Sequence, residues 1–304
     1  MHFPERIKIR EVSSRDGLQG EPKLLTTDAK IELVNILSRA GFSQINVTSF
    51  VNPARVPAMA DAAEVMARID RRPGVVYDAT VPNLKGAQRA IHAGADAVVT
   101  FVAASEAANQ SNVGRGTEEA LRLAGQVIGA ARAAGLGAIG TISSAFGSPY
   151  GEPVGEADVT RLARRLADAG ATGLALGDTS GEANPRQVHD LVALLLAEFG
   201  DLELSLHLHD TRGLALANAT AAMQAGAVCF DGAVGGIGGS PFTANSAGNL
   251  ATEDLVEMCH RMGIATRVDQ AVVLAAHRFL AAELGRPLDS KVGRLSLSEA
   301  GTSR

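Results

Sequence analysis

The chain has few cysteines, no block of basic residues and no long apolar run. Among its 304 residues only Cys229 and Cys259 are thiols, which argues against a disulfide framework and for a reducing compartment. We therefore expect a cytoplasmic protein. The net charge of −5 comes from 28 basic and 33 acidic side chains, and without a basic block nucleic acid is not an expected partner.

A membrane is not an expected partner either. No apolar run approaches the roughly 18 uncharged residues that a transmembrane helix needs. The amino terminus, Met-His-Phe-Pro-Glu-Arg, lacks the apolar stretch of a signal peptide.

What the sequence does have is a regular alternation of helical patterns, glycines and short apolar runs. The glycines stand where a helix would need a left-handed residue to stop, and they are Gly41, Gly74, Gly94, Gly135, Gly170, Gly200, Gly226 and Gly263. The apolar runs predict eight strands, at 7–12, 44–49, 75–80, 97–102, 138–143, 173–176, 202–207 and 229–234. Several runs are almost continuously apolar, as in a parallel sheet that is covered on both faces.

Eight strands alternating with helices over about 260 residues predict an α/β protein of the (β/α)8 TIM-barrel type. Two separate α/β domains would need a linker, and no segment of linker composition interrupts the series. We expect residues 1–265 to form a TIM-barrel catalytic domain. Residues 266–304 are expected to add a C-terminal helix, from Thr266 to Leu284, and a polar tail that is loose after Ser290, both packed on the barrel.

The sequence His-Leu-His-Asp at 207–210 ends one of the expected strands. Residues i and i+2 of a strand point to the same face, so His207 and His209 present two imidazoles side by side. Taken alone, such a pair also fits chance or core packing. In a TIM barrel, however, reacting groups gather at the carboxyl ends of the strands, so Asp16 could converge with both histidines. Oxygen and imidazole ligands with room for water suit Mg²⁺ or Mn²⁺, and Zn²⁺ is less favoured because no cysteine lies nearby.

Other polar residues at strand ends have more than one interpretation. Asp178 is a candidate to assist a catalytic base. Asp210 either orients a histidine or caps the following helix. The run from Gly235 to Gly239 either cradles a phosphate or forms a mobile loop that closes over a substrate.

Six motifs, taken together in order and spacing, resemble those of 3-hydroxy-3-methylglutaryl-CoA (HMG-CoA) lyases. They are Arg-Asp-Gly-Leu-Gln at 15–19, Thr-Ser-Phe-Val at 48–51, Pro-Asn-Leu-Lys-Gly at 82–86, Leu-Gly-Asp-Thr at 176–179, His-Leu-His-Asp-Thr at 207–211 and Ser-Ala-Gly-Asn-Leu-Ala-Thr-Glu-Asp-Leu at 246–255. The resemblance runs from about Ile7 to Val292. Claisen-type synthases of the same superfamily share the Arg-Asp and His-x-His signatures, but the Gly-Asn-Leu-Ala-Thr-Glu-Asp run resembles the lyase branch.

The resemblance implies a divalent cation held by Asp16, His207, His209 and the amide oxygen of Asn249. It also implies an acyl-CoA substrate that is cleaved to acetyl-CoA and a keto acid, and we expect a homo-oligomer such as a dimer. Because the leaving fragment is a thioester enolate, a guanidinium at Arg15 could stabilise its oxygen as charge develops.

Three residues depart from the family pattern. Ser240 stands where the family has a cysteine that acts as acid or base, Asn46 stands where it has a glutamate, and Arg212 stands where an uncharged residue is expected. The changes fit neutral drift, an altered substrate or lost chemistry. We predict a preferred substrate with a bulkier or more anionic acyl group than HMG-CoA. The candidate catalytic residues are Arg15, Asp178, Asn46 and Ser240.

The sequence therefore favours a metal-dependent carbon–carbon lyase. Two alternatives stay open: a Claisen-type condensing enzyme, and a non-catalytic acyl-CoA-binding paralogue.

Overall fold

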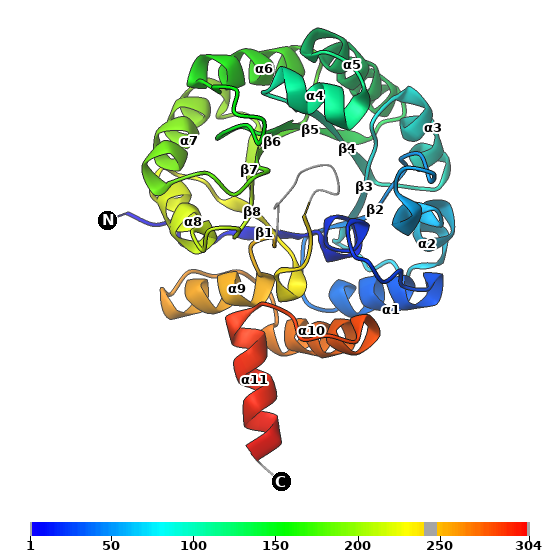
Figure 1. Ribbon diagram of the computed structural model, residues 1–304, viewed down its shortest axis with the longest axis vertical. Helices are drawn as coiled ribbons and strands as arrows, with labels where there is room; N and C mark the ends of the chain where they lie inside the picture. Colours follow the sequence, from blue (N-terminus) through cyan, green and yellow to red (C-terminus); the bar gives the residue numbers. More distant parts are fainter. Residues whose placement is uncertain (1, 240–247, 303–304) are drawn as a thin grey trace.

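The computed structural model describes residues 2–239 and 248–302 and confirms the TIM barrel (Figure 1). Eight parallel strands follow one another in sequence order, and β1 pairs with both β2 and β8, which closes the barrel. The strands are β1 Lys8–Glu11, β2 Gln44–Ser49, β3 Val76–Thr80, β4 Ala97–Ala103, β5 Gly137–Ser143, β6 Gly173–Asp178, β7 Glu203–Leu208 and β8 Cys229–Gly232. Each lies within or beside a predicted apolar run.

Helices surround the barrel on its outside (Figure 1). Those that precede the last strand are α1 Thr27–Ser38, α2 Ala62–Arg68, α3 Leu84–His92, α4 Glu106–Val113, α5 Thr117–Ala133, α6 Glu156–Asp168, α7 Pro185–Phe199 and α8 Ala215–Gln224. In α5, the buried residues are related by steps of three, four and seven positions, and they are Ala120, Leu121, Ala124, Val127, Ile128 and Ala131. This spacing gives the helix one apolar stripe, which packs against the strands.

Seven of the eight predicted helix-terminating glycines have φ between 74° and 105°, the left-handed region. Gly74 nevertheless ends no helix, because α2 already ends at Arg68 and Gly74 lies in the turn before β3. Gly200 is the exception, because it follows α7 with φ of −58°. At that position the sequence rule gave the correct end of the helix but the wrong backbone conformation.

In the described part of the chain, three α-helices follow β8: α9 Thr252–Arg261, α10 Gln270–Leu284 and α11 Lys291–Thr302. The predicted C-terminal helix is α10, which begins at Gln270, where the Asp269 side chain accepts a hydrogen bond from the Ala271 amide at 2.9 Å. It packs against α1 and α9.

The prediction that the chain is loose after Ser290 was wrong, because α11 occupies that segment. The Asp254 carboxylate accepts hydrogen bonds from the amides of Lys291 and Val292, at 3.0 and 2.8 Å. These are amides of the first helical turn that have no partner within the helix, so Asp254 stabilises its start. Figure 1 shows α11 projecting away from the barrel.

Among the described residues, no helix combines the length and the apolar character that a membrane crossing requires.

Candidate metal centre and active site

A cavity of about 370 Å³ opens at the carboxyl ends of the strands. Its lining includes four of the predicted site residues, namely Arg15, Asp16, His207 and His209. Reacting groups of TIM barrels lie at this face of the fold, so the position agrees with the sequence argument.

Asp16 is placed by a turn of π-helix, Ser13–Gly17, that follows β1 directly. The Val12 carbonyl accepts hydrogen bonds from the amides of Arg15, Asp16 and Gly17, at 3.2, 2.8 and 3.2 Å. The turn directs the Asp16 side chain, which is only 8% exposed, into the barrel mouth. Gly17 is needed because a Cβ there would lie 2.8 Å from the Ile237 side chain.

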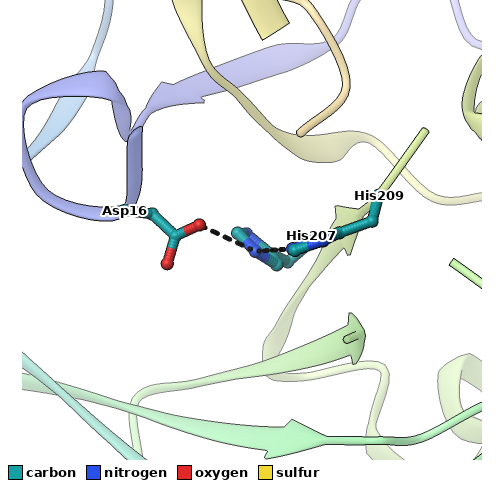
Figure 2. Close-up of side chains that lie close together, drawn as sticks. All are labelled: Asp16, His207 and His209. Carbon is teal, nitrogen blue, oxygen red and sulfur yellow. Dashed lines mark hydrogen bonds and ion pairs between the residues drawn. The ribbon is translucent and has the colours of Figure 1, made fainter. Parts of the chain in front are cut away.

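The two histidines converge with Asp16 as predicted (Figure 2). Nε2 of His207 lies 3.2 Å from Nε2 of His209 and 3.7 Å from Oδ2 of Asp16. One ligand atom of each of the three residues lies within 4.8 Å of the others. Both imidazoles thus present the same ring nitrogen toward one point.

Asn249 reaches the same point from the segment between β8 and α9. It forms an antiparallel bridge with His209, and its Nδ2 donates to Oδ2 of Asp16 at 2.9 Å. Its amide oxygen is buried and has no hydrogen-bond partner among the described residues. A buried acceptor without a partner, on an amide that contacts Asp16, is suited to become a cation ligand when an ion binds.

The protonation states also suit a cation. Burial and the neighbouring His207 lower the pKa of His209 to about 4, so its imidazole is neutral at pH 7 and carries a lone pair. Burial alone would raise the pKa of Asp16, but Arg15 and the two histidines hold it below its usual range. An anionic oxygen and the neutral imidazole of His209 therefore face a common point with His207, and the residues fit a divalent cation.

Asp231 on β8 was missed by the sequence analysis. Its Oδ2 lies 3.0 Å from Nδ1 of His207, so it holds the tautomer that leaves Nε2 free for a ligand role. Arg10, its register partner on β1, contacts it through Nε at 3.1 Å and Nη2 at 3.2 Å. Burial would raise the pKa of Asp231, but Arg10 and the hydrogen bond from His207 hold it below the usual range.

Arg15 is anchored at two points. Its Nη1 donates to Oδ1 of Asp16 at 2.6 Å, and its Nε donates to Oδ1 of Asn46 at 2.5 Å. No described residue pairs with its Nη2. Arg15 and Asn46, two of the predicted catalytic residues, are thus in direct contact beside the cavity.

Glu11 lies fully buried behind the site and ties β1 to α9. Its carboxylate accepts hydrogen bonds from the Ser13 amide at 2.9 Å and from Thr252 Oγ1 at 2.6 Å. Burial raises the pKa of Glu11 to about 7 despite these hydrogen bonds.

The structure does not bring Asp178 into this cluster. Its Oδ1 accepts hydrogen bonds from the amides of Glu182 and Ala183, at 2.9 and 3.2 Å, in the loop after β6. Burial raises the pKa of Asp178 to about 6. A catalytic role for it stays a prediction that none of its contacts supports. Ser240 lies outside the described residues.

Two further expectations are resolved by the contacts. Asp210 caps α8, since its Oδ1 accepts from the Ala215 amide at 2.9 Å. Arg212, the charged residue that stands where an uncharged one is expected, does not line the cavity. It donates to the Ser180 and Gly181 carbonyls at 3.0 and 2.9 Å and pairs with Glu182 at 3.1 Å, outside the lining of the cavity.

Comparison with known proteins agrees with this geometry. The family model described as HMGL-like matches residues 6–280. The chain is 43% identical to the hydroxymethylglutaryl-CoA lyase YngG of Bacillus subtilis, over 96% of this chain and 97% of that protein. It is 40% identical to the human mitochondrial hydroxymethylglutaryl-CoA lyase, over 96% of this chain and 90% of that protein.

Solved structures give the same result. A crystal structure of the Bacillus subtilis HMG-CoA lyase superposes with a TM-score of 0.94, covering 97% of this chain and 99% of that one. An HMG-CoA lyase from Acinetobacter baumannii, in complex with coenzyme A and 3-methylmalate, superposes with a TM-score of 0.93 at 37% identity, over 97% of this chain and 96% of that one.

Proposed function

This chain belongs to the HMGL-like family, and we propose that it is a metal-dependent carbon–carbon lyase that cleaves HMG-CoA to acetyl-CoA and acetoacetate. The observation that carries the proposal is the convergence of Asp16, His207 and His209 on one cavity, with Arg15 beside them. That arrangement combines a cation site with a fixed guanidinium.

The cation would be held by Asp16, His207, His209 and the amide oxygen of Asn249. The oxygen and nitrogen ligands favour Mg²⁺ or Mn²⁺ over softer metals. When bound, such an ion polarises the substrate hydroxyl and orients the carbon–carbon bond that breaks.

Arg15 would stabilise the thioester enolate. The substrate hydroxyl gives up its proton to a base as the bond between C2 and C3 of the acyl chain breaks. C3 then keeps the oxygen as a ketone, and the electron pair of the broken bond passes to the thioester fragment. The two anchors of Arg15 fix its guanidinium, which leaves Nη2 available for the developing oxyanion. The enolate carbon then takes up a proton, and Ser240 remains our candidate to deliver it.

The structure weakens two of the three arguments for an altered substrate. The charge of Arg212 is paired with Glu182 outside the cavity. Asn46 itself contacts Arg15 and donates a hydrogen bond to the carboxylate of Asp78, so an acid one strand away is linked to Arg15 through Asn46, although it does not line the cavity. We therefore propose HMG-CoA itself as the first substrate to test.

We also propose a reducing location such as the cytoplasm, since Cys229 and Cys259 are buried free thiols. A homo-oligomer stays a prediction, which light scattering of the purified protein would check.

The test is to incubate the purified protein and Mg²⁺ with HMG-CoA and a panel of branched 3-hydroxyacyl-CoA thioesters, with product detection by mass. We expect acetyl-CoA and acetoacetate, and no product after chelation. Calorimetric titration of a divalent cation into the protein, after a chelator has removed bound metal, should show one cation per chain. His209→Ala should abolish that binding. Cation binding without cleavage of any thioester would contradict the lyase. Condensation of acetyl-CoA with a keto acid under the same conditions would support the synthase instead.

A further inference from the structure

Asp78 on β3 is a buried acid that the proposed function leaves without a role. It is fully buried and does not line the cavity. Its two carboxylate oxygens accept hydrogen bonds from two side-chain amides on β2, Oδ1 from Asn46 and Oδ2 from Gln44. Asn46 and Asp78 are register partners in the barrel, so their side chains meet in its interior.

Asn46 connects this acid to Arg15. Its Nδ2 donates to Asp78, and its Oδ1 accepts from Nε of Arg15 at 2.5 Å and from Oγ1 of Thr80 at 3.1 Å. An amide has one donating end and one accepting end, so it can serve both neighbours in one orientation only. The rotated orientation would set an NH₂ group against the N–H of Arg15 and an oxygen against a carboxylate.

The choice between these orientations depends on Asp78 being an acceptor. Both oxygens of Asp78 accept hydrogen bonds from side-chain amides, which the ionised form can do without competition. Burial raises the pKa of Asp78, and Arg10 and the two amide donors only partly oppose that shift. With the Asn46 amide fixed, Arg15 has one anchor at Asn46 and a second at Asp16, so its guanidinium plane is set from both sides.

We propose that Asp78 is a positioning residue that acts through Asn46 to hold the Arg15 guanidinium in the orientation needed for catalysis. The inference rests on the proposed function, in which Arg15 stabilises the enolate. Asp78 itself touches neither substrate nor cation. It fixes one end of a three-residue chain whose other end faces the reacting atoms.

The first variant is Asp78→Asn. The new amide has one oxygen for two donors, so an N–H now opposes either Asn46 or Gln44, and the Asn46 amide loses its fixed orientation. Because a misplaced guanidinium costs most in the transition state, we expect kcat to fall by about 10- to 100-fold while KM changes less than about threefold. Cation affinity should be unchanged, since none of the proposed ligands is altered.

The second variant exchanges the two side chains, Asn46→Asp together with Asp78→Asn. The carboxylate at position 46 then accepts directly from Nε of Arg15, and the amide at position 78 donates to that carboxylate. The exchange keeps the atoms and the charge of the pair, so we expect kcat to return to within about threefold of the wild type.

A matched control is Asp61→Asn. Asp61 pairs with the largely buried Lys30 at 2.8 Å, and neither residue lines the cavity. We expect this variant to lose stability while keeping wild-type kcat, which separates a positioning defect from a general loss of stability.

A readout that is independent of turnover separates this inference from the proposed function. The readout is the rate at which the Nε–H proton of Arg15 exchanges with solvent, measured by ¹⁵N NMR. The Nε–H signal of Arg15 is assigned as the one that is missing in the Arg15→Lys variant. We expect slow proton exchange in the wild type, fast exchange in Asp78→Asn, and slow exchange again in the double variant Asn46→Asp with Asp78→Asn. If the wild type cleaves no thioester, the proposed function fails but the exchange rates still decide the positioning role. Wild-type kcat and slow exchange in Asp78→Asn would overturn the proposal. A double variant that does not fold, or whose kcat stays as low as that of Asp78→Asn, would also overturn the proposal. This test applies even if Asp78→Asn alone does not fold.

Discussion

The carboxylate of Asp231 lies 3.0 Å from Nδ1 of His207, on the side of the ring opposite to the point where the candidate ligand atoms converge. A carboxylate in this place fixes both the tautomer and the orientation of a metal-binding imidazole. Arg10 in turn holds Asp231 ionised.

We therefore predict that Asp231→Asn weakens cation binding by about 10- to 100-fold, measured as a Kd by calorimetry. The variant should also be less stable by about 3–5 kcal/mol, because Arg10 loses its buried charge partner. Asp210→Asn is the control, since Asp210 caps α8 and makes no hydrogen bond with either histidine. If Asp231→Asn and Asp210→Asn bound the cation with equal affinity, Asp231 would not be the residue that orients His207.

Arg15→Lys should lower kcat by about 10²- to 10³-fold with little change in melting temperature. Lysine keeps the charge but cannot reach Asn46 and Asp16 through two separate N–H groups and still present a third to the substrate. Steady-state kinetics and thermal unfolding of the same preparation would measure both effects. Most of the wild-type rate surviving in Arg15→Ala would place enolate stabilisation elsewhere.

Glu11 should make stability depend on pH. Its folded-state pKa of about 7 lies above the ordinary value of 4.5, so the folded state binds the proton more tightly than the unfolded chain. This stabilisation is fully present below about pH 4.5 and is lost as pH rises through 7, a change of about 3 kcal/mol. Glu11→Gln cannot titrate, so the stability of the wild type relative to this variant should fall across that range in denaturant titrations. In the control Glu5→Gln, at an exposed position, the free energy of unfolding should depend on pH as it does in the wild type. If the free energy of unfolding of Glu11→Gln also followed the wild-type pH dependence, the raised pKa of Glu11 would be contradicted.

Arg212→Gln should change kcat/KM for HMG-CoA by less than about threefold. Its charge is paired with Glu182 on a partly exposed loop, where an ion pair contributes little and is screened by solvent. A panel of thioesters with added carboxylate groups would reveal any role in binding an anionic acyl chain. A selective loss of turnover with those thioesters would restore the hypothesis of a more anionic substrate.

The histidine pair and Asp16 could be predicted from sequence because they depend on two strong regularities. Side chains alternate along a strand, and the carboxyl ends of barrel strands meet at one face. Gly200 and α11 show the limits of local patterns. A glycine can end a helix without a left-handed conformation, and a polar segment becomes helical when a distant carboxylate, here Asp254, caps its first turn.

The partners of the site were harder to predict. Asp231 and Asp78 lie in short strands of four and five residues, which are too brief to establish which side chains point into the barrel. The direction of Arg212 depends on where the Ser180 and Gly181 carbonyls lie, and nothing in the local sequence indicates that contact.

Two buried pairs inside the barrel, one charged and one polar, also constrain how such a sequence can change over generations. Arg10 and Asp231 are register partners, as are Asn46 and Asp78, and all four side chains are buried. A single replacement in the Arg10–Asp231 pair passes through a state with an unmatched buried charge, and one in the Asn46–Asp78 pair leaves a buried polar group unpaired. Lineages that carry this interior should therefore inherit each pair together, and a residue transplanted alone from a relative should be poorly tolerated.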